Sequence, residues 1–190
     1  MIRASARTSL VLVDVIKSFF DPSQPNFYKD APKVLGPIKE LLTAARELES
    51  LIIHAVERHH PGLHDFEFSK LPRHHQTGDF DAEFATGFAP NVANNEVEIG
   101  KRRYSAFYAT DLDLTLREQG VTRLIVVGVK TNVCIRATVQ DAFAGGFEVI
   151  VPREATNSNR PHLAEASLED IDRYFGQVTS LAEALDELRA

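Results

Sequence analysis

The feature that most constrains the fold of this chain is a regular alternation of short apolar runs with helical patterns. The apolar runs are rich in β-branched residues and short, which is typical of strands buried on both faces of a sheet. They occupy residues 9–14, 51–56, 96–99, 124–128 and 147–151, with a short sixth run at 178–179. Helical periodicity occupies residues 34–48, 112–120, 135–144, 163–175 and 181–188.

This alternation predicts an α/β protein, because strands that alternate with helices pair in parallel through right-handed crossovers. We expect a three-layer α/β/α sandwich of the Rossmann type, with a mostly parallel sheet of about six strands. Residues 1–190 are expected to form a single domain, since the sequence contains no linker, repeat or low-complexity tract. The one long irregular segment, residues 57–95, is expected to serve function, because long loops in compact domains usually do.

Composition and charge exclude several classes of protein. Apolar residues make up 44% and charged residues 25% of the chain, which is ordinary for a folded globular protein. The net charge of −6 argues against a nucleic-acid partner. A lone cysteine excludes an internal disulfide and a multi-cysteine zinc site. No apolar run has the length of a secretory signal or a membrane span, so we predict a cytoplasmic protein without a membrane partner.

Three reactive residues follow predicted strands at their carboxyl ends. Asp14 ends the first strand, Lys101 follows the third, and Cys134 lies in the turn between the fourth strand and the next helix. In an open parallel sheet this edge is where ligands bind. Each residue alone has an ordinary explanation: a strand-end cap, a solvated lysine and a buried cysteine. Their convergence favours a nucleophilic cysteine, whose thiolate the start of a helix would stabilise.

The sequence resembles the isochorismatase-like cysteine hydrolases, which include nicotinamidases, N-carbamoylsarcosine amidases, and ureidoacrylate and biuret hydrolases. Four segments carry the resemblance, and their order and spacing match over essentially the whole chain. They are residues 11–14 with Phe19 five positions later, residues 100–107, residues 128–134 and residues 138–142.

The resemblance implies a catalytic triad of Asp14, Lys101 and Cys134. It also implies a cis peptide bond before Lys130, and an oxyanion hole formed by the backbone N–H groups of Lys130 and Cys134. The implied reaction is hydrolysis of a small amide or a ureido or carbamoyl C–N bond through a thioester. No organic cofactor is expected, and the resemblance implies a homodimer or homotetramer.

The predicted substrate pocket and metal ligands depend on less specific signals. The pocket residues we predict are Phe19, Phe20, His60, Tyr104, Phe107 and Asn157. Nicotinamidases carry Asp-Trp-His-Pro and Pro-Arg-His segments, which residues 58–61 and 72–75 resemble, with His60 and His74 in the histidine positions. Arg58 stands in place of the aspartate of the nicotinamidase segment and would repel a cation, so we predict that no metal is bound. If a metal is bound, His60 and His74 are its candidate ligands.

Two other interpretations stay open. A nicotinamidase-type amidase would use a metal ion near these histidines. A non-enzymatic flavodoxin-like module would bind a ligand at the same sheet edge, and would make the convergence of Asp14, Lys101 and Cys134 a coincidence. That module lacks the glycine-rich phosphate loop expected after the first strand.

Overall fold

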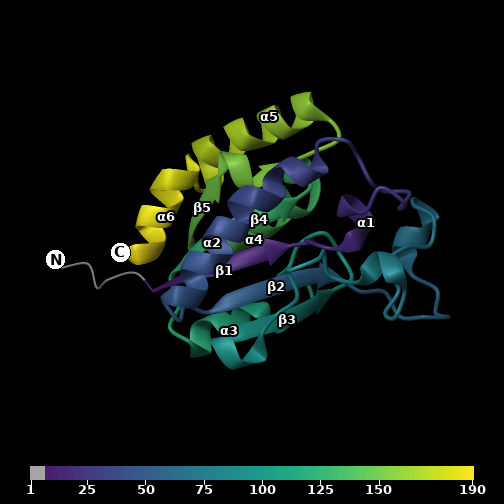
Figure 1. Cartoon of the computed structure of the whole chain (residues 1–190), viewed down its shortest axis with the longest axis horizontal. Coiled ribbons are helices and arrows are strands. Elements are labelled where there is room, and N and C mark those ends of the chain that lie inside the picture. Colours follow the sequence, from purple (N-terminus) through teal and green to yellow (C-terminus); the bar gives the residue numbers. More distant parts are fainter. Residues whose placement is uncertain (1–6) are drawn as a thin grey trace.

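A seven-stranded parallel sheet forms the centre of the molecule (Figure 1). The computed structural model describes residues 7–190. The strand order is β3-β2-β1-β4-β5-β7, and β6 pairs with the end of β4. The strands are β1 (Thr8–Val13), β2 (Ile52–Glu57), β3 (Glu96–Lys101), β4 (Arg123–Val129), β5 (Glu148–Pro152), β6 (Thr156–Asn157) and β7 (Gln177–Thr179).

Helices cover both faces of the sheet. They are α1 (Lys17–Phe20), α2 (Leu35–Glu47), α3 (Leu112–Glu118), α4 (Arg136–Ala144), α5 (Pro161–Asp170) and α6 (Leu181–Arg189). One π-helical segment, Thr131–Ile135, precedes α4, and another, Ile171–Phe175, follows α5. Helices α2 and α6 pack on one face, and α3, α4 and α5 on the other, which gives the predicted three-layer sandwich (Figure 1).

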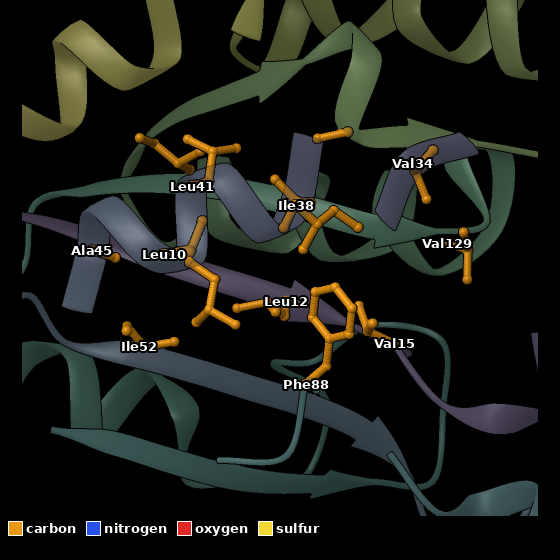
Figure 2. Packing of buried hydrophobic residues seen from close by; sticks show 14 of the residues in the cluster. Leu10, Leu12, Val15, Val34, Ile38, Leu41, Ala45, Ile52, Phe88 and Val129 are labelled. Carbon is orange, nitrogen blue, oxygen red and sulfur yellow. The ribbon is translucent and has the colours of Figure 1, made fainter. Parts of the chain in front are cut away.

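Alternate residues of β1 enter two separate hydrophobic clusters, because successive side chains of a strand point to opposite faces. Leu10 and Leu12 pack beneath Ile38 and Leu41 of α2 (Figure 2). Val11 and Val13 face the cluster formed with α3 and α4. A continuous apolar run is therefore what a central strand of this sheet requires.

The predicted elements agree with the structure apart from their ends and one short strand. All six predicted strands are present within one or two residues of their expected limits. The two-residue strand β6 was not predicted, because so short a segment has no periodicity to detect. The segment 1–6, in which we expected no targeting signal, lies outside the described residues. Within residues 7–190, no helix has the length and apolar character needed to span a membrane.

Gly128 brings the ends of β1 and β4 together. Its φ of 118° lies in the region that favours glycine, and a Cβ atom there would lie 2.0 Å from the carbonyl oxygen of Val13. Asp14 follows Val13 with a φ of 53°, a conformation that aspartate tolerates better than most residues. This close approach places Asp14 beside the turn that carries Cys134.

The long segment between β2 and β3 folds over the carboxyl end of the sheet, next to α1 at the right of Figure 1. It contains the short 3₁₀ turns Phe66–Ser69, Phe80–Ala82 and Val92–Asn94. An isolated bridge between Ile16 and Phe84 ties it to the rest of the fold, and a second bridge joins His59 to Gln76 within the segment. The segment therefore forms one wall above the strand ends.

Candidate active site

Four neighbouring strands each deliver one ionisable side chain to the same edge of the sheet. In spatial order, Lys101 ends β3, Glu57 ends β2, Asp14 follows β1, and Cys134 lies in the turn after β4. All four are buried. The strands are parallel and in register, with Glu57 opposite Lys101, so their carboxyl ends form a row of reactive groups.

Lys101 lies between the carboxylate of Asp14 and the sulfur of Cys134. Its Nζ atom is 2.8 Å from Asp14 Oδ2, 3.7 Å from Cys134 Sγ and 4.0 Å from Glu57 Oε2. Asp14 Oδ1 accepts a hydrogen bond of 2.9 Å from the backbone N–H of Glu57, which fixes the carboxylate. The structure thus brings together the three residues that the sequence placed in one catalytic group.

Burial and charge act in opposite directions on this group. Burial disfavours the charged form of Lys101, but the nearby Asp14, Cys134 and Glu57 outweigh it and hold the pKa of the ammonium above its usual range. Burial also raises the pKa of the Cys134 thiol well above its usual value, against the effect of Lys101 and with that of Asp14. The thiolate that we expected from the helix start is therefore disfavoured, and a proton acceptor is needed at Cys134.

The turn that carries Cys134 differs from an ordinary helix start. The peptide bond between Val129 and Lys130 is cis, at the position implied by the family resemblance. The π-helical segment Thr131–Ile135 follows, and both Val133 and Ile135 donate their N–H groups to the carbonyl of Lys130. Lys130 and Cys134 both line the same cavity, as the predicted oxyanion hole requires.

A cavity of about 360 Å³ opens above these residues. Its walls come from α1, the segment after β2, the segment after β3 and the cysteine turn. They are Phe19, Pro25, Asn26, Glu57, Glu67, Leu71, Pro72, Arg73, His74, His75, Asp81, Tyr104, Lys130, Val133 and Cys134. Burial and the carboxylates of Glu67 and Glu57 raise the pKa of Tyr104 to about 12, so its hydroxyl is a donor at neutral pH. The volume suits a small molecule.

Two of the six predicted pocket residues, Phe19 and Tyr104, line the cavity, and four do not. Phe20 packs against the core beneath α2, and Phe107 packs against Phe147 in the opposite cluster. Asn157 accepts a hydrogen bond from the Tyr28 hydroxyl and donates one to the carbonyl of Asp30. These three side chains hold neighbouring segments together, so the structure does not place them in the lining of the cavity.

His60, the fourth of these, is exposed, and its neighbour His59 is buried beside Glu57. His59 Nε2 lies 2.8 Å from Glu57 Oε1, and its Nδ1 lies 3.1 Å from Asp65 Oδ2. A match displaced by one residue would pair Glu57 and His59, instead of Arg58 and His60, with the acid and the histidine of the nicotinamidase segment. Arg58 forms an ion pair with Glu98 outside the cavity lining.

Glu57 is the centre of a buried cluster of titratable groups that the sequence analysis missed. Its Oε1 atom lies 2.8 Å from His59 Nε2, 2.8 Å from His74 Nε2 and 3.3 Å from His75 Nδ1. Burial raises the pKa of Glu57, but these histidines and Lys101 outweigh it and hold the pKa well below its usual value. Glu57 ends a predicted strand, so the rule that identified Asp14 and Lys101 could have found it.

The same cluster has the composition of a metal site. Glu57, His59, Glu67 and His74 each offer a ligand atom, and these atoms lie within 4.8 Å of one another. His59 Nδ1 faces Asp65, and His74 Nδ1 donates to the carbonyl of Pro72, which directs both Nε2 atoms inward. Metal-binding histidines are oriented by partners of this kind. One buried oxygen, Glu67 Oε1, has no hydrogen-bond partner among the described residues.

Comparison with known proteins identifies the family of this chain. The family model of the isochorismatase domain matches residues 8–183. The chain belongs to the isochorismatase family. Maleamate amidohydrolase of Pseudomonas putida is 31% identical over 191 residues, which cover 96% of this chain and 87% of the relative. N-carbamoylsarcosine amidase of an Arthrobacter species is 30% identical over 192 residues, which cover 97% of this chain and 72% of the relative.

A solved structure shows the same fold. The pyrazinamidase of Pyrococcus horikoshii in complex with zinc has a TM-score of 0.82 to this chain at 28% identity. The match covers 92% of this chain and 99% of that chain. This isochorismatase-family chain is therefore an enzyme of the hydrolase class.

Proposed function

We propose that this hydrolase is a cysteine-dependent amidohydrolase that cleaves a C–N bond of a small amide, ureido or carbamoyl compound. The observation that carries the proposal is the buried contact of Asp14, Lys101 and Cys134 beside a cavity that Cys134 lines. The names of the two amidohydrolase relatives support the same bond class. A nucleophile, a proton acceptor and a fixed cation are the groups that acyl transfer requires.

In the first half of the reaction, Cys134 Sγ attacks the carbonyl carbon while its proton passes to Asp14. The proton acceptor is needed because burial keeps the thiol protonated. Lys101, 3.7 Å from the sulfur, stabilises the negative charge as it moves between sulfur and carboxylate. The carbonyl oxygen becomes an oxyanion, which accepts hydrogen bonds from the backbone N–H groups of Lys130 and Cys134.

The C–N bond then breaks, and the proton on Asp14 passes to the leaving ammonia or amine. A thioester to Cys134 remains. A water molecule attacks the thioester carbonyl as the Asp14 carboxylate takes one of its protons. The C–S bond breaks, the carboxylic acid leaves, and the proton returns from Asp14 to Cys134.

Ammonia release from a panel of small amides tests this proposal. The panel contains nicotinamide, N-carbamoyl amino acids, biuret, ureidoacrylate and maleamate. We expect release from at least one compound, and a fall of at least about a thousandfold in Cys134→Ala because the nucleophile is lost. Circular dichroism of the variant provides the control for folding. Substantial turnover by a folded Cys134→Ala protein would refute the cysteine mechanism.

The Glu57 cluster favours a second candidate, a metal-assisted amidase of the nicotinamidase type. Glu57, His59 and His74, with Glu67 beside them, would hold a divalent ion such as zinc, whose preferred ligands are nitrogen and oxygen donors of this kind. An ion there would act as a Lewis acid and orient a polar group of the substrate. The cluster adjoins the triad through Glu57, 4.0 Å from Lys101, so both candidates use one cavity.

A further inference from the structure

Lys130 places a cation without a carboxylate partner in the cavity. Its side chain is partly buried and lines the cavity with Cys134. Its Nζ atom lies 5.3 Å from the centre of the Phe19 ring and 5.9 Å from that of Tyr28. Across residues 7–190, no carboxylate oxygen lies within ion-pair distance of Lys130. The triad lysine, Lys101, is by contrast paired with Asp14.

Two acidic groups of the cavity have partners other than Lys130. Three histidines surround Glu57, and Asp81 accepts a hydrogen bond from the backbone N–H of His75. The third, Glu67, lies 3.8 Å from His74 Nε2 and forms no ion pair with Lys130. Burial lowers the pKa of the Lys130 ammonium, and Arg160 adds to this effect against the opposing effects of Cys134 and Glu57. Among the described residues, no carboxylate of the cavity forms an ion pair with this ammonium.

Partial burial of an ammonium is costly unless an anion or a set of acceptors compensates for it. The two aromatic rings beside Lys130 compensate in part, through their electron-rich faces. They also leave the ammonium hydrogens free to bind a ligand. The backbone N–H of Lys130 belongs to the proposed oxyanion hole, which binds the scissile carbonyl. A substrate group bound by the Lys130 side chain would therefore lie only a few bonds along the substrate from that carbonyl.

We propose that Lys130 binds a carboxylate of the substrate, so that the enzyme acts on small amides that carry a carboxylate group near the amide. Lys130 is then a specificity-determining residue as well as part of the turn that forms the oxyanion hole. This inference rests on the proposed amidohydrolase function and narrows its substrate class. The other polar side chains of the cavity then contact the amide end of the substrate.

Matched pairs of substrates test the charge preference. Malonamate, succinamate and glutaramate each have a neutral counterpart, the corresponding diamide, in which a second amide replaces the carboxylate. We expect wild-type kcat/KM to favour the acid over its diamide. In Lys130→Met this acid-to-diamide ratio falls by about 10- to 100-fold, the range expected for a charged hydrogen bond. Using the ratio cancels any effect of the substitution on the oxyanion hole.

Two further variants serve as controls. Lys130→Arg keeps the cation and is expected to keep most of the ratio. Lys39→Met removes the same charge from the exposed face of α2 and is expected to leave the ratio unchanged. A wild-type enzyme that prefers diamides, or a ratio that is the same in Lys130→Met and wild type, would overturn the assignment.

A second measurement does not depend on amide turnover. Cys134 is the only cysteine, so all thiol alkylation reports on this site. Iodoacetate carries a carboxylate where iodoacetamide carries a neutral amide, which is the same difference as between each acid and its diamide. Both reagents form a C–S bond with the thiol as iodide leaves. We expect the iodoacetate-to-iodoacetamide rate ratio, normalised to that of glutathione, to fall about 10-fold in Lys130→Met. Any change in the pKa of the thiol affects both reagents equally.

The two measurements separate the failure of the inference from the failure of the proposed function. If no amide is hydrolysed but the alkylation ratio falls in Lys130→Met, the carboxylate site stands and the amidohydrolase proposal fails. If amides are hydrolysed through Cys134 and neither ratio changes in Lys130→Met, the function stands and the carboxylate site is refuted. A carboxylate preference that Lys130→Met retains and a chelator abolishes would assign the anion to a metal ion instead.

Discussion

His59 and His60 are adjacent in the chain and lie in opposite environments. His59 is fully buried between Glu57 and Asp65, and its ring packs edge to face against that of His74 with ring centres 5.1 Å apart. His60 is exposed and begins a turn. The two residues therefore provide a matched pair of substitutions at the proposed metal site, one within the cluster and one outside it.

We predict that His59→Ala abolishes binding of zinc and that His60→Ala leaves it unchanged. In the proposed metal site His59 would supply one of the nitrogen ligands, and without it Glu57 and His74 would hold a divalent ion much more weakly. The measurement is metal content by mass spectrometry after incubation with zinc and dialysis. Equal zinc in His59→Ala and wild type, or no zinc in wild type, would contradict the assignment.

For single residues, the sequence predicts positions along strands better than it predicts the direction of side chains in loops. Asp14, Lys101 and Cys134 could be found because the ends of parallel strands meet at one edge. His59 could not be distinguished from His60, because the segment after β2 has no regular periodicity to fix which side chain points inward. Phe20 and Phe107 were misplaced for a related reason, since an aromatic residue beside a site packs equally well in the core.

At the scale of secondary-structure elements, Glu96 connects three parts of the fold. It is the first residue of the edge strand β3, and its buried carboxylate binds Arg46 of α2 through contacts of 2.7 and 3.0 Å. The same carboxylate lies 2.8 Å from His54 Nε2 of β2 and accepts the N–H of Asn91 at 3.0 Å. This network anchors the edge strand at the end opposite the active site, where β3 has a neighbour on one side only.

We predict that Glu96→Gln lowers the free energy of unfolding by about 3 kcal/mol at pH 7, because it breaks a buried ion pair. Burial opposes ionisation of Glu96, but Arg46, Asn91 and His54 outweigh it and lower the pKa. A carboxylate with a lowered pKa stabilises the fold above its unfolded pKa of about 4.3. That stabilisation is lost as the pH falls through the lower folded value.

Urea unfolding from pH 7 down to pH 3 checks this prediction. The difference between wild type and Glu96→Gln is expected to narrow below about pH 4.3, where the unfolded carboxyl begins to be protonated. Glu98→Gln is the control on the same strand, because Glu98 forms an exposed ion pair with Arg58 that contributes about 0.5 kcal/mol or less. A difference that stays constant down to pH 3 would show that the Glu96 charge does not stabilise the fold.

On the scale of the whole molecule, one sheet lies between two hydrophobic clusters, and its central strands contribute side chains to both. The cluster under α2 and α6 contains Leu10 (Figure 2). The cluster under α3 and α4 contains Val11, its neighbour in β1. The sequence predicted this layering because both faces of each central strand are apolar. The sequence cannot supply the shape of the cavity, because its walls come from segments that meet only after the sheet has formed. A homodimer or homotetramer stays a prediction.

Because the four central strands, β1, β2, β4 and β5, contribute to both clusters, we predict that the chain unfolds in one cooperative transition. Leu10→Ala is expected to lower the free energy of unfolding by about 2–5 kcal/mol. Val11→Ala is expected to lower it by less, since fewer carbons are removed. Both variants should shift the same transition, although they weaken opposite faces of the sheet. Amide hydrogen exchange follows the two faces separately, through α2 on one face and α4 on the other. Exchange of both helices with the same free energy in both variants supports a single unit. In a molecule whose layers unfold separately, Val11→Ala would release the amides of α4, which packs on the Val11 face of the sheet, before those of α2.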